Sequence, residues 1–154
     1  MPKETINDLS KFLEPFPDTV QELAFWLRGY VWDLYPDCNE LIYDNYNAVA
    51  FGWSVSDKIK DLICTIAVGR STHNIQFGFY WGNEIADPEK RLIGNGKQYR
   101  YIVVKNKEGF PIAYMQKLLE ASHINALSKL KEPQVLKGLT IMKSVSAAKK
   151  QAKK

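Results

Sequence analysis

Two spacings of apolar residues divide the chain into helical ends and a strand-rich middle. Over 18–35 the apolar positions recur every three or four residues, which predicts one long helix with a buried face. Pro36 prevents this helix from continuing. A shorter helix is predicted over Lys3–Leu13, and a last helix carries Pro111 in its first turn.

Between Glu40 and Val104 the apolar repeat shortens to two, which is the repeat of a β-strand. Alternation is clear in the segments 48–54, 62–68, 74–81 and 99–104, and a short extra strand is expected around Leu41–Tyr43. Because consecutive strands with short turns usually pair as neighbours, the pattern favours an antiparallel meander. The sequence therefore predicts an α+β fold, a two-layer sandwich of a five-stranded antiparallel meander packed by N- and C-terminal helices.

The two faces of the predicted sheet differ in the size of their side chains. One face is large and aromatic, and the other is lined by small or polar residues, so we expect helices on one side and an open surface on the other. The open face includes Ala48, Ala50, Gly52, Gln76 and Gly78. Aromatic residues near the strand ends are candidates for the rim of a groove: Tyr43, Tyr46, Tyr80 and Trp81.

Charge is distributed unevenly along the 154 residues. The composition, 45% hydrophobic and 25% charged, is that of one globular domain. Seven lysines and one glutamate lie in 131–154, so this segment has a net charge of +6. The whole chain has a net charge of +4, so residues 1–130 sum to −2. We therefore predict a single domain over 1–132 and a flexible lysine-rich tail over 133–154, which gives at most weak, salt-dependent binding to nucleic acid.

The segments that would target the chain to a membrane or a secretory route are missing from the sequence pattern. No window approaches about 20 consecutive apolar residues, and the first residues lack an apolar leader. A cytoplasmic protein with reduced thiols is expected. Cys64 sits in an apolar strand pattern and is expected to be packed, whereas Cys38 follows Pro36-Asp37 in a turn that we expect to be exposed.

The chemistry-bearing residues do not form a recognisable catalytic motif. Only two histidines are present, and no G-x-S-x-G sequence frames a serine, so no enzyme is predicted. The glycine-rich loop around Lys97 is not a Walker A loop, because Gln98 and a strand follow the lysine. Two interpretations of this segment remain. It either binds an anion or a partner, or it is a turn that its glycines permit and whose charged side chains are solvated. The residues of this candidate loop are Asp87, Gly94, Gly96, Lys97 and Arg100.

Acidic residues cluster where the long helix is expected to enter the sheet. Asp37, Glu40 and Asp44 supply carboxylate oxygens, which hard cations and ferrous iron bind when several converge on one point. The alternative for the same residues is a solvated acidic edge. They are the candidate metal ligands.

The stretch from Phe77 to Tyr101 resembles the YdhG-like family, also called domain of unknown function 1801. Family members show a glycine–aromatic strand, a D-P-x-x-x-L-x-G-x-G-K loop and then an arginine that begins the next strand. The matching positions are Gly78-Phe79, Asp87-Pro88, Leu92, Gly94, Gly96, Lys97 and Arg100. The resemblance extends roughly over 18–130.

This resemblance implies both a fold and a function. The family is similar to frataxin in its α-β(5)-α layout, and some members are described as intracellular iron chaperones that deliver iron to iron–sulfur cluster or haem assembly. A small cytosolic, non-catalytic binding protein with weakly bound ferrous iron and an unknown protein partner is therefore expected. The alternative is a metal-free protein-interaction adaptor that uses the open sheet face and the Asp87–Arg100 loop.

Overall fold

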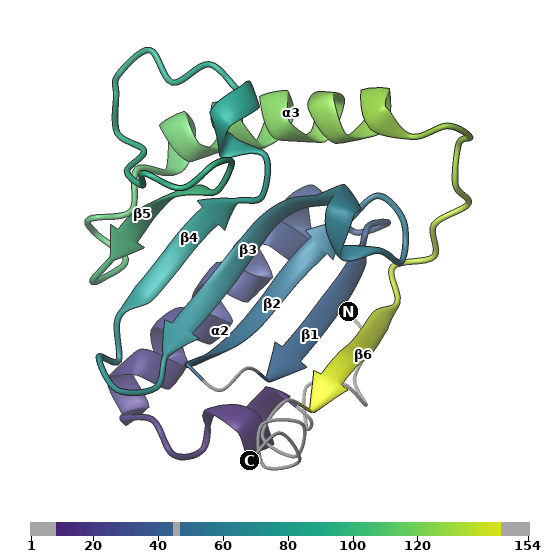
Figure 1. The fold of residues 1–154 in the computed structure, drawn as a ribbon. Coiled ribbons are helices and arrows are strands. Elements are labelled where there is room, and N and C mark those ends of the chain that lie inside the picture. Colours follow the sequence, from purple (N-terminus) through teal and green to yellow (C-terminus); the bar gives the residue numbers. More distant parts are fainter. Residues whose placement is uncertain (1–8, 45–46, 146–154) are drawn as a thin grey trace.

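The computed structural model describes residues 9–44 and 47–145 of the chain. Residues 9–13 are helical. The named elements follow in this order (Figure 1): α2 (Asp18–Leu34), β1 (Asn39–Asp44), β2 (Ala48–Ser54), η1 (Ile59–Asp61), β3 (Leu62–Gly69), β4 (Ile75–Phe79), η2 (Gly82–Glu84), β5 (Arg100–Val104), α3 (Ile112–Lys129) and β6 (Thr140–Val145).

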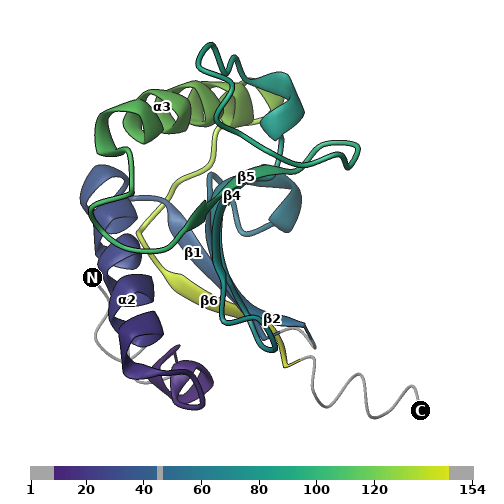
Figure 2. The same ribbon diagram turned by 90° about the vertical axis from the view of Figure 1, so that its left-hand side faces the viewer.

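One six-stranded sheet forms the centre of the molecule, with the strand order β5-β4-β3-β2-β1-β6. Helix α2 runs across one face of this sheet, and α3 lies on the same side over one end (Figure 2). The α+β class predicted from the sequence is confirmed.

The predicted five-stranded, purely antiparallel sheet is wrong, because a sixth strand makes the sheet mixed. Strands β1 to β5 pair antiparallel in chain order, and β6 pairs parallel with β1. This strand belongs to the lysine-rich segment for which we expected a flexible tail. Its short run Thr-Ile-Met-Lys-Ser-Val has strand character, but lysines on both sides gave the segment the composition of a solvated tail. The sheet therefore continues well beyond residue 132.

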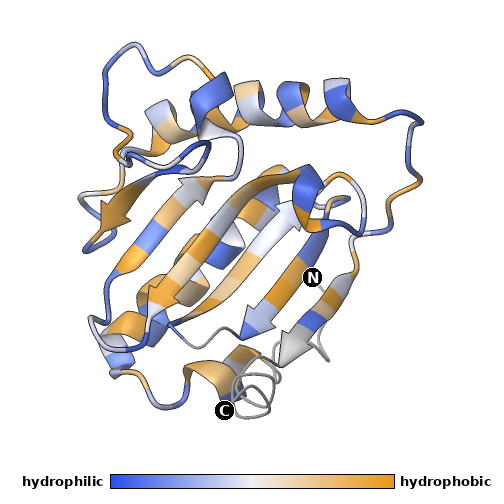
Figure 3. Cartoon of the chain, viewed as in Figure 1, coloured by the Kyte–Doolittle hydropathy of each residue, from blue (hydrophilic) through white to orange (hydrophobic). Residues whose placement is uncertain are grey.

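The core lies between α2 and the aromatic face of the sheet. The helix begins directly after Pro17 and ends at Leu34, before the Tyr35-Pro36 pair, as the sequence predicts. Its buried face includes Leu23, Leu27 and Val31. These side chains meet Phe51 and other alternate strand positions, and Figure 3 shows the resulting bands of hydrophobic residues on the strands.

A buried ion pair connects both layers within this core. Arg28 of α2 donates from Nε to Glu40 Oε2 at 2.7 Å and from Nη2 to Oε1 at 2.6 Å. Thr140 of β6 donates its hydroxyl to the same Oε1 at 2.9 Å. The carboxylate of Glu40 thus links the helix, the inner strand β1 and the last strand β6.

Candidate functional site

The face of the sheet opposite α2 is formed by two rows of side chains in register. Alternate positions on the same strands point into the core, so these rows point away from the helices. One row is Leu41, Gly52, Thr65, Gly78 and Tyr101, and the other is Tyr43, Ala50, Ala67, Gln76 and Val103. None of these ten side chains carries a charge. We call this surface, together with Tyr80 and Tyr99, the tyrosine face.

Tyr99 lies directly on Gly78, which explains why this strand position has no side chain. A Cβ atom built on Gly78 would be 2.2 Å from the Tyr99 hydroxyl oxygen. That hydroxyl donates to Gln76 Oε1 at 3.3 Å, and the ring stacks on Tyr101 with centroids 5.5 Å apart and planes at 20°. Burial raises the pKa of Tyr99, and the neighbouring Tyr43 raises it further. The ring is therefore fixed by contacts on several sides.

Tyr43 occupies the other half of this face and reaches across the neighbouring strand. It sits on β1, yet its hydroxyl forms a hydrogen bond with Thr65 on β3. The intervening β2 positions are Ala50 and Gly52, which are small enough for a ring to pass over them. Burial raises the pKa of Tyr43, the Thr65 hydrogen bond partly offsets this, and Tyr80 adds to the rise. The small residues therefore form a floor that the tyrosine rings cover.

The loop between β4 and β5 is held in place by Asp87. Its Oδ2 accepts the Leu92 amide at 2.8 Å, and its Oδ1 accepts both the Arg91 amide at 3.1 Å and the Tyr114 hydroxyl from α3. Burial acts to raise the pKa of Asp87, but these hydrogen bonds, that of Tyr114 foremost, lower it below its ordinary value. Asp87 therefore fixes the loop on α3, and its oxygens are engaged within the chain.

Arg100 closes the same loop at its other end. The guanidinium Nη1 donates to the carbonyls of Gly96 and Tyr99, each at 2.8 Å. Gly94 adopts a φ of 128°, a conformation that other residues rarely take. Because Arg100 is bound to backbone carbonyls, the loop offers no ready pair of cationic donors for an anion.

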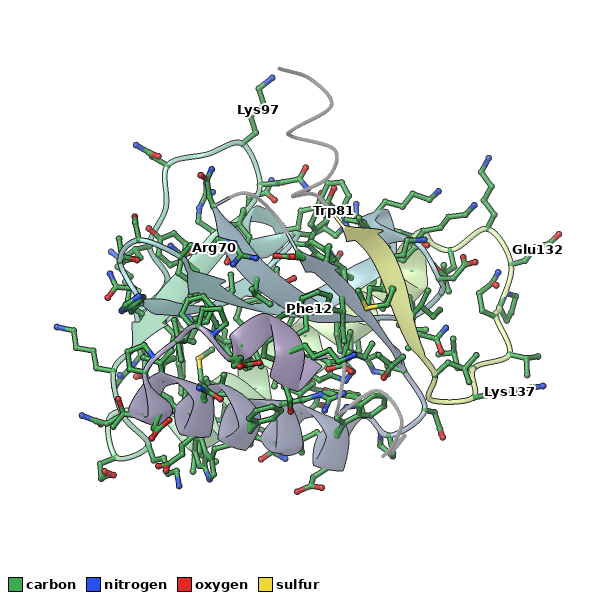
Figure 4. The ribbon with its side chains drawn as sticks, turned by 90° about the horizontal axis from the view of Figure 1, so that it is seen from below. Phe12, Arg70, Trp81, Lys97, Glu132 and Lys137 are labelled. Carbon is green, nitrogen blue, oxygen red and sulfur yellow. The ribbon has the colours of Figure 1, made fainter. Side chains whose placement is uncertain are left out.

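Lys97 is the exposed charged side chain of the predicted anion loop. It extends from the loop on the side of the sheet opposite α2 (Figure 4). The structure thus brings Asp87, Gly94, Gly96 and Arg100 together as a framework that presents Lys97.

Trp81 anchors the start of the loop to two other elements. Its indole nitrogen donates to the Lys60 carbonyl of η1 at 2.8 Å. The ammonium of Lys129 lies 4.1 Å from the indole centroid and 2.8 Å from Glu84 Oε1. The hydrogen bond of Lys129, and then that of Asn125, lower the pKa of Glu84. The loop is therefore fixed at both ends and to α3, although only Gly82–Glu84 has helical backbone.

The three predicted metal ligands do not gather at one point. Glu40 is bound by Arg28 in the core, and Asp44 pairs with Arg70. Asp37 is exposed in the turn before β1. Over residues 9–44 and 47–145, no three His, Cys, Asp or Glu side chains are grouped so that they could hold a metal ion.

The histidines and cysteines occupy separate packing environments. His73 contacts the Phe16 ring, and His123 contacts the Tyr35 ring, with centroids 5.6 and 4.9 Å apart respectively. The expectation that Cys38 is exposed is wrong: it is 3% exposed, because the turn folds its side chain into the core, and burial raises its pKa to about 12. Cys64 is fully buried, as expected.

Two tyrosines that dominate the open face, Tyr99 and Tyr101, are not among the candidates that the sequence pattern indicates. Their alternation was visible, but the face to which they point depends on the pairing of β5 with β4. Glycine at position 78 was the available signal, because a gap on one strand accommodates a large ring from its neighbour. Tyr46, which we expected on the groove rim, lies outside the described residues.

Comparisons of the chain with protein-family models, with curated proteins and with solved structures found no match. Within the described part of the chain, the helices are too short or too polar to cross a lipid bilayer.

Proposed function

We propose that the chain is a small, non-catalytic binding protein of the YdhG-like type that contacts a macromolecular partner through the tyrosine face and the Asp87–Arg100 loop. The observation that carries this proposal is the fixation of that loop. In this loop the side chains of Asp87, Arg100 and Trp81 form contacts within the chain, whereas Lys97 extends into solvent on the side of the uncharged aromatic surface.

A surface of this kind is suited to recognition because its groups are already held in position. Stacking of Tyr99 on Tyr101 and the hydrogen bond of Tyr99 to Gln76 restrict the ring before any partner arrives. A restrained ring loses little conformational entropy on binding, so more of the contact free energy appears as affinity. Tyrosine is also among the residues that contribute most at interfaces.

The family resemblance agrees with this proposal in the order of the elements. One helix, five sequential antiparallel strands and a second helix follow one another from α2 to α3. The match at Gly78 also has a physical reason here, since Tyr99 needs the space above that residue. The proposal assigns no metal to Glu40 and Asp44, because each carboxylate already has an arginine partner.

A photo-reactive amino acid placed on each side of the molecule tests which surface meets a partner. Val103 lies on the tyrosine face and is 38% exposed, whereas Ile124 on α3 is 60% exposed and serves as the control. A diazirine side chain at position 103 is expected to give one discrete adduct in an extract of the source organism, and the same group at position 124 is expected to give none. Equal adducts at both positions, or none at 103, would contradict the proposal.

An anaerobic ferrous titration of the full chain, with magnesium as the control ion, tests the iron alternative. We expect no saturable, iron-selective heat. Saturable binding that is lost in the Asp37→Asn and Asp44→Asn variants would instead restore the chaperone reading.

A further inference from the structure

We propose that the tyrosine face binds single-stranded nucleic acid, with bases stacked on Tyr101 and Tyr80 and with phosphates drawn to lysines at its rim. This inference rests on the proposed function, because it assigns a partner chemistry to the same surface.

Stacking is the first argument, because Tyr101 and Tyr80 are half-exposed near the face of the sheet that α2 does not cover. Sheets that bind single strands use aromatic side chains on an uncovered face as platforms for successive bases. Tyr101 is half-buried, and its ring is supported from one side by Tyr99, which itself rests on Gly78. Tyr80 is also half-buried, and it packs edge-on against Trp81 at 5.4 Å. Two supported rings, Tyr101 on β5 and Tyr80 in the turn directly after β4, thus have area available to a ligand.

The size of the neighbouring residues is the second argument. Ala67 and Val103 lie in the row next to that of Tyr101, and both present short apolar side chains. Gln76 adds a carboxamide beside Val103. A flat heterocycle with polar edges matches this combination of aromatic, small and amide groups better than a bulky aliphatic side chain does.

Charge is the third argument and favours a polyanion over a protein surface of mixed charge. The ten strand positions of the two rows carry no carboxylate, and Lys97 extends on this side. In sequence, 146–154 follow β6 directly and add four lysines without an acid. The charges of residues 1–130 sum to −2, so the attraction of phosphates is confined to the lysines near this face. We expect it to be strongly salt-dependent.

Fluorescence anisotropy with the full chain tests the inference. The probes are fluorescein-labelled twelve-nucleotide oligo-dT and oligo-U, with a twelve-base-pair duplex as the comparison, each at 50 and 200 mM salt. Both single strands are expected to bind more tightly than the duplex, because stacking requires exposed base faces. Affinity should fall with salt in proportion to the phosphates contacted.

Matched variants separate stacking from charge. Tyr101→Ala is expected to weaken binding about tenfold, since one stacked base is lost, while Tyr101→Phe should bind as the parent chain does. Lys97→Gln should weaken binding about two- to threefold and reduce the salt slope by roughly 0.7. Lys117→Gln, an exposed lysine on α3, is the control and should have no effect. Circular dichroism of each variant confirms that it is folded.

Several outcomes overturn the inference. They are equal affinity of Tyr101→Ala and the parent chain, duplex binding as tight as single-strand binding, and loss of all binding when only the four lysines of 146–154 are changed to glutamine. Absence of binding at 50 mM salt does so too. The position-103 adduct keeps the two proposals distinguishable: an adduct that resists nuclease but not protease preserves the proposed function and refutes the nucleic-acid partner.

Discussion

Arg28 and Glu40 form a two-bond ion pair inside the core, where the two side chains are 1% and 0% exposed. The pair is incompletely satisfied, since Nη1 of Arg28 is buried without a partner among the described residues. Glu40, a metal ligand predicted from the sequence, is therefore a buried structural carboxylate. Its charge is neutralised by Arg28 of α2.

The first prediction concerns removal of one partner of this pair. Glu40→Ala leaves an uncompensated guanidinium in the core and is expected to reduce the free energy of unfolding by about 3–5 kcal/mol. The double variant Arg28→Met/Glu40→Leu should recover most of that loss, because it removes both buried charges. Urea denaturation of the two variants and the parent chain measures the difference. A double variant as unstable as Glu40→Ala would contradict this account of the pair.

The second prediction concerns the contact between Tyr99 and Gly78. Gly78→Ala forces the ring off the strand and should destabilise the fold by about 1–3 kcal/mol, the usual range for an overpacked site. In the background of Tyr99→Ala the same glycine change should cost much less, since the clashing ring is gone. Thermal unfolding of both single variants and the double variant gives the coupling between the two positions. Additive effects would show that the ring does not rest there.

The third prediction concerns thiol reactivity. Burial raises the pKa of Cys38 to about 12 and that of Cys64 well above its ordinary value. At pH 8 the reactive thiolate is therefore scarce, and both sulfurs are shielded from reagents. A disulfide reagent added to the native protein should titrate neither thiol, and two thiols should react after denaturation. Rapid reaction of Cys38 in the native state would show that its turn is open.

These cases show how far sequence patterns reach. The limits of α2 were predictable because Pro17 and Pro36 stop the backbone on both sides. The β6 strand was not, since a single strand among lysines gains its stability from pairing with β1 rather than from its own composition. The same holds for Glu40, whose role depends on an arginine that only the packing of α2 brings within reach.

For the candidate site, the sequence indicated which residues matter but not which interactions they make. Sequence spacing singled out Asp87 and Arg100, but hydrogen bonds to Leu92 and Gly96 show that both hold the loop together. A charge in a glycine-rich loop can bind a ligand or the backbone, and only three-dimensional placement distinguishes the two.

The fourth prediction concerns pH and His123. Burial lowers the pKa of this imidazole, so the unfolded chain binds its proton more readily than the folded chain does. The stability that depends on neutral His123 is complete above its ordinary pKa of 6.5 and declines as the pH falls below that value toward the folded pKa. Thermal unfolding between pH 7.5 and 5 should show this decline, and the decline should be smaller in His123→Phe. An identical pH dependence in the variant would exclude His123 as its source.

The fifth prediction concerns the extent of the folded domain. A chain ending at residue 133 lacks β6 and with it the Thr140 hydrogen bond to Glu40, so it should lose at least the roughly 1.5–3 kcal/mol that a hydrogen bond to a charged group contributes. A chain ending at residue 145 keeps the strand and should match the full chain. The urea midpoint of the three lengths is the measurement, and equal midpoints would mean that β6 contributes nothing to stability.

The parallel docking of β6 on β1 also determines when the sheet can be completed during synthesis. Thr140 and Glu40 are 100 residues apart, so β1 waits for its second neighbour while all the intervening strands and α3 are made. At roughly 5–20 residues per second, that interval lasts about 5–20 seconds. During this time the nascent chain presents an unpaired strand edge, and Glu40 lacks its hydrogen bond from Thr140. Until β6 docks, this edge of β1 is open to mispairing with other chains.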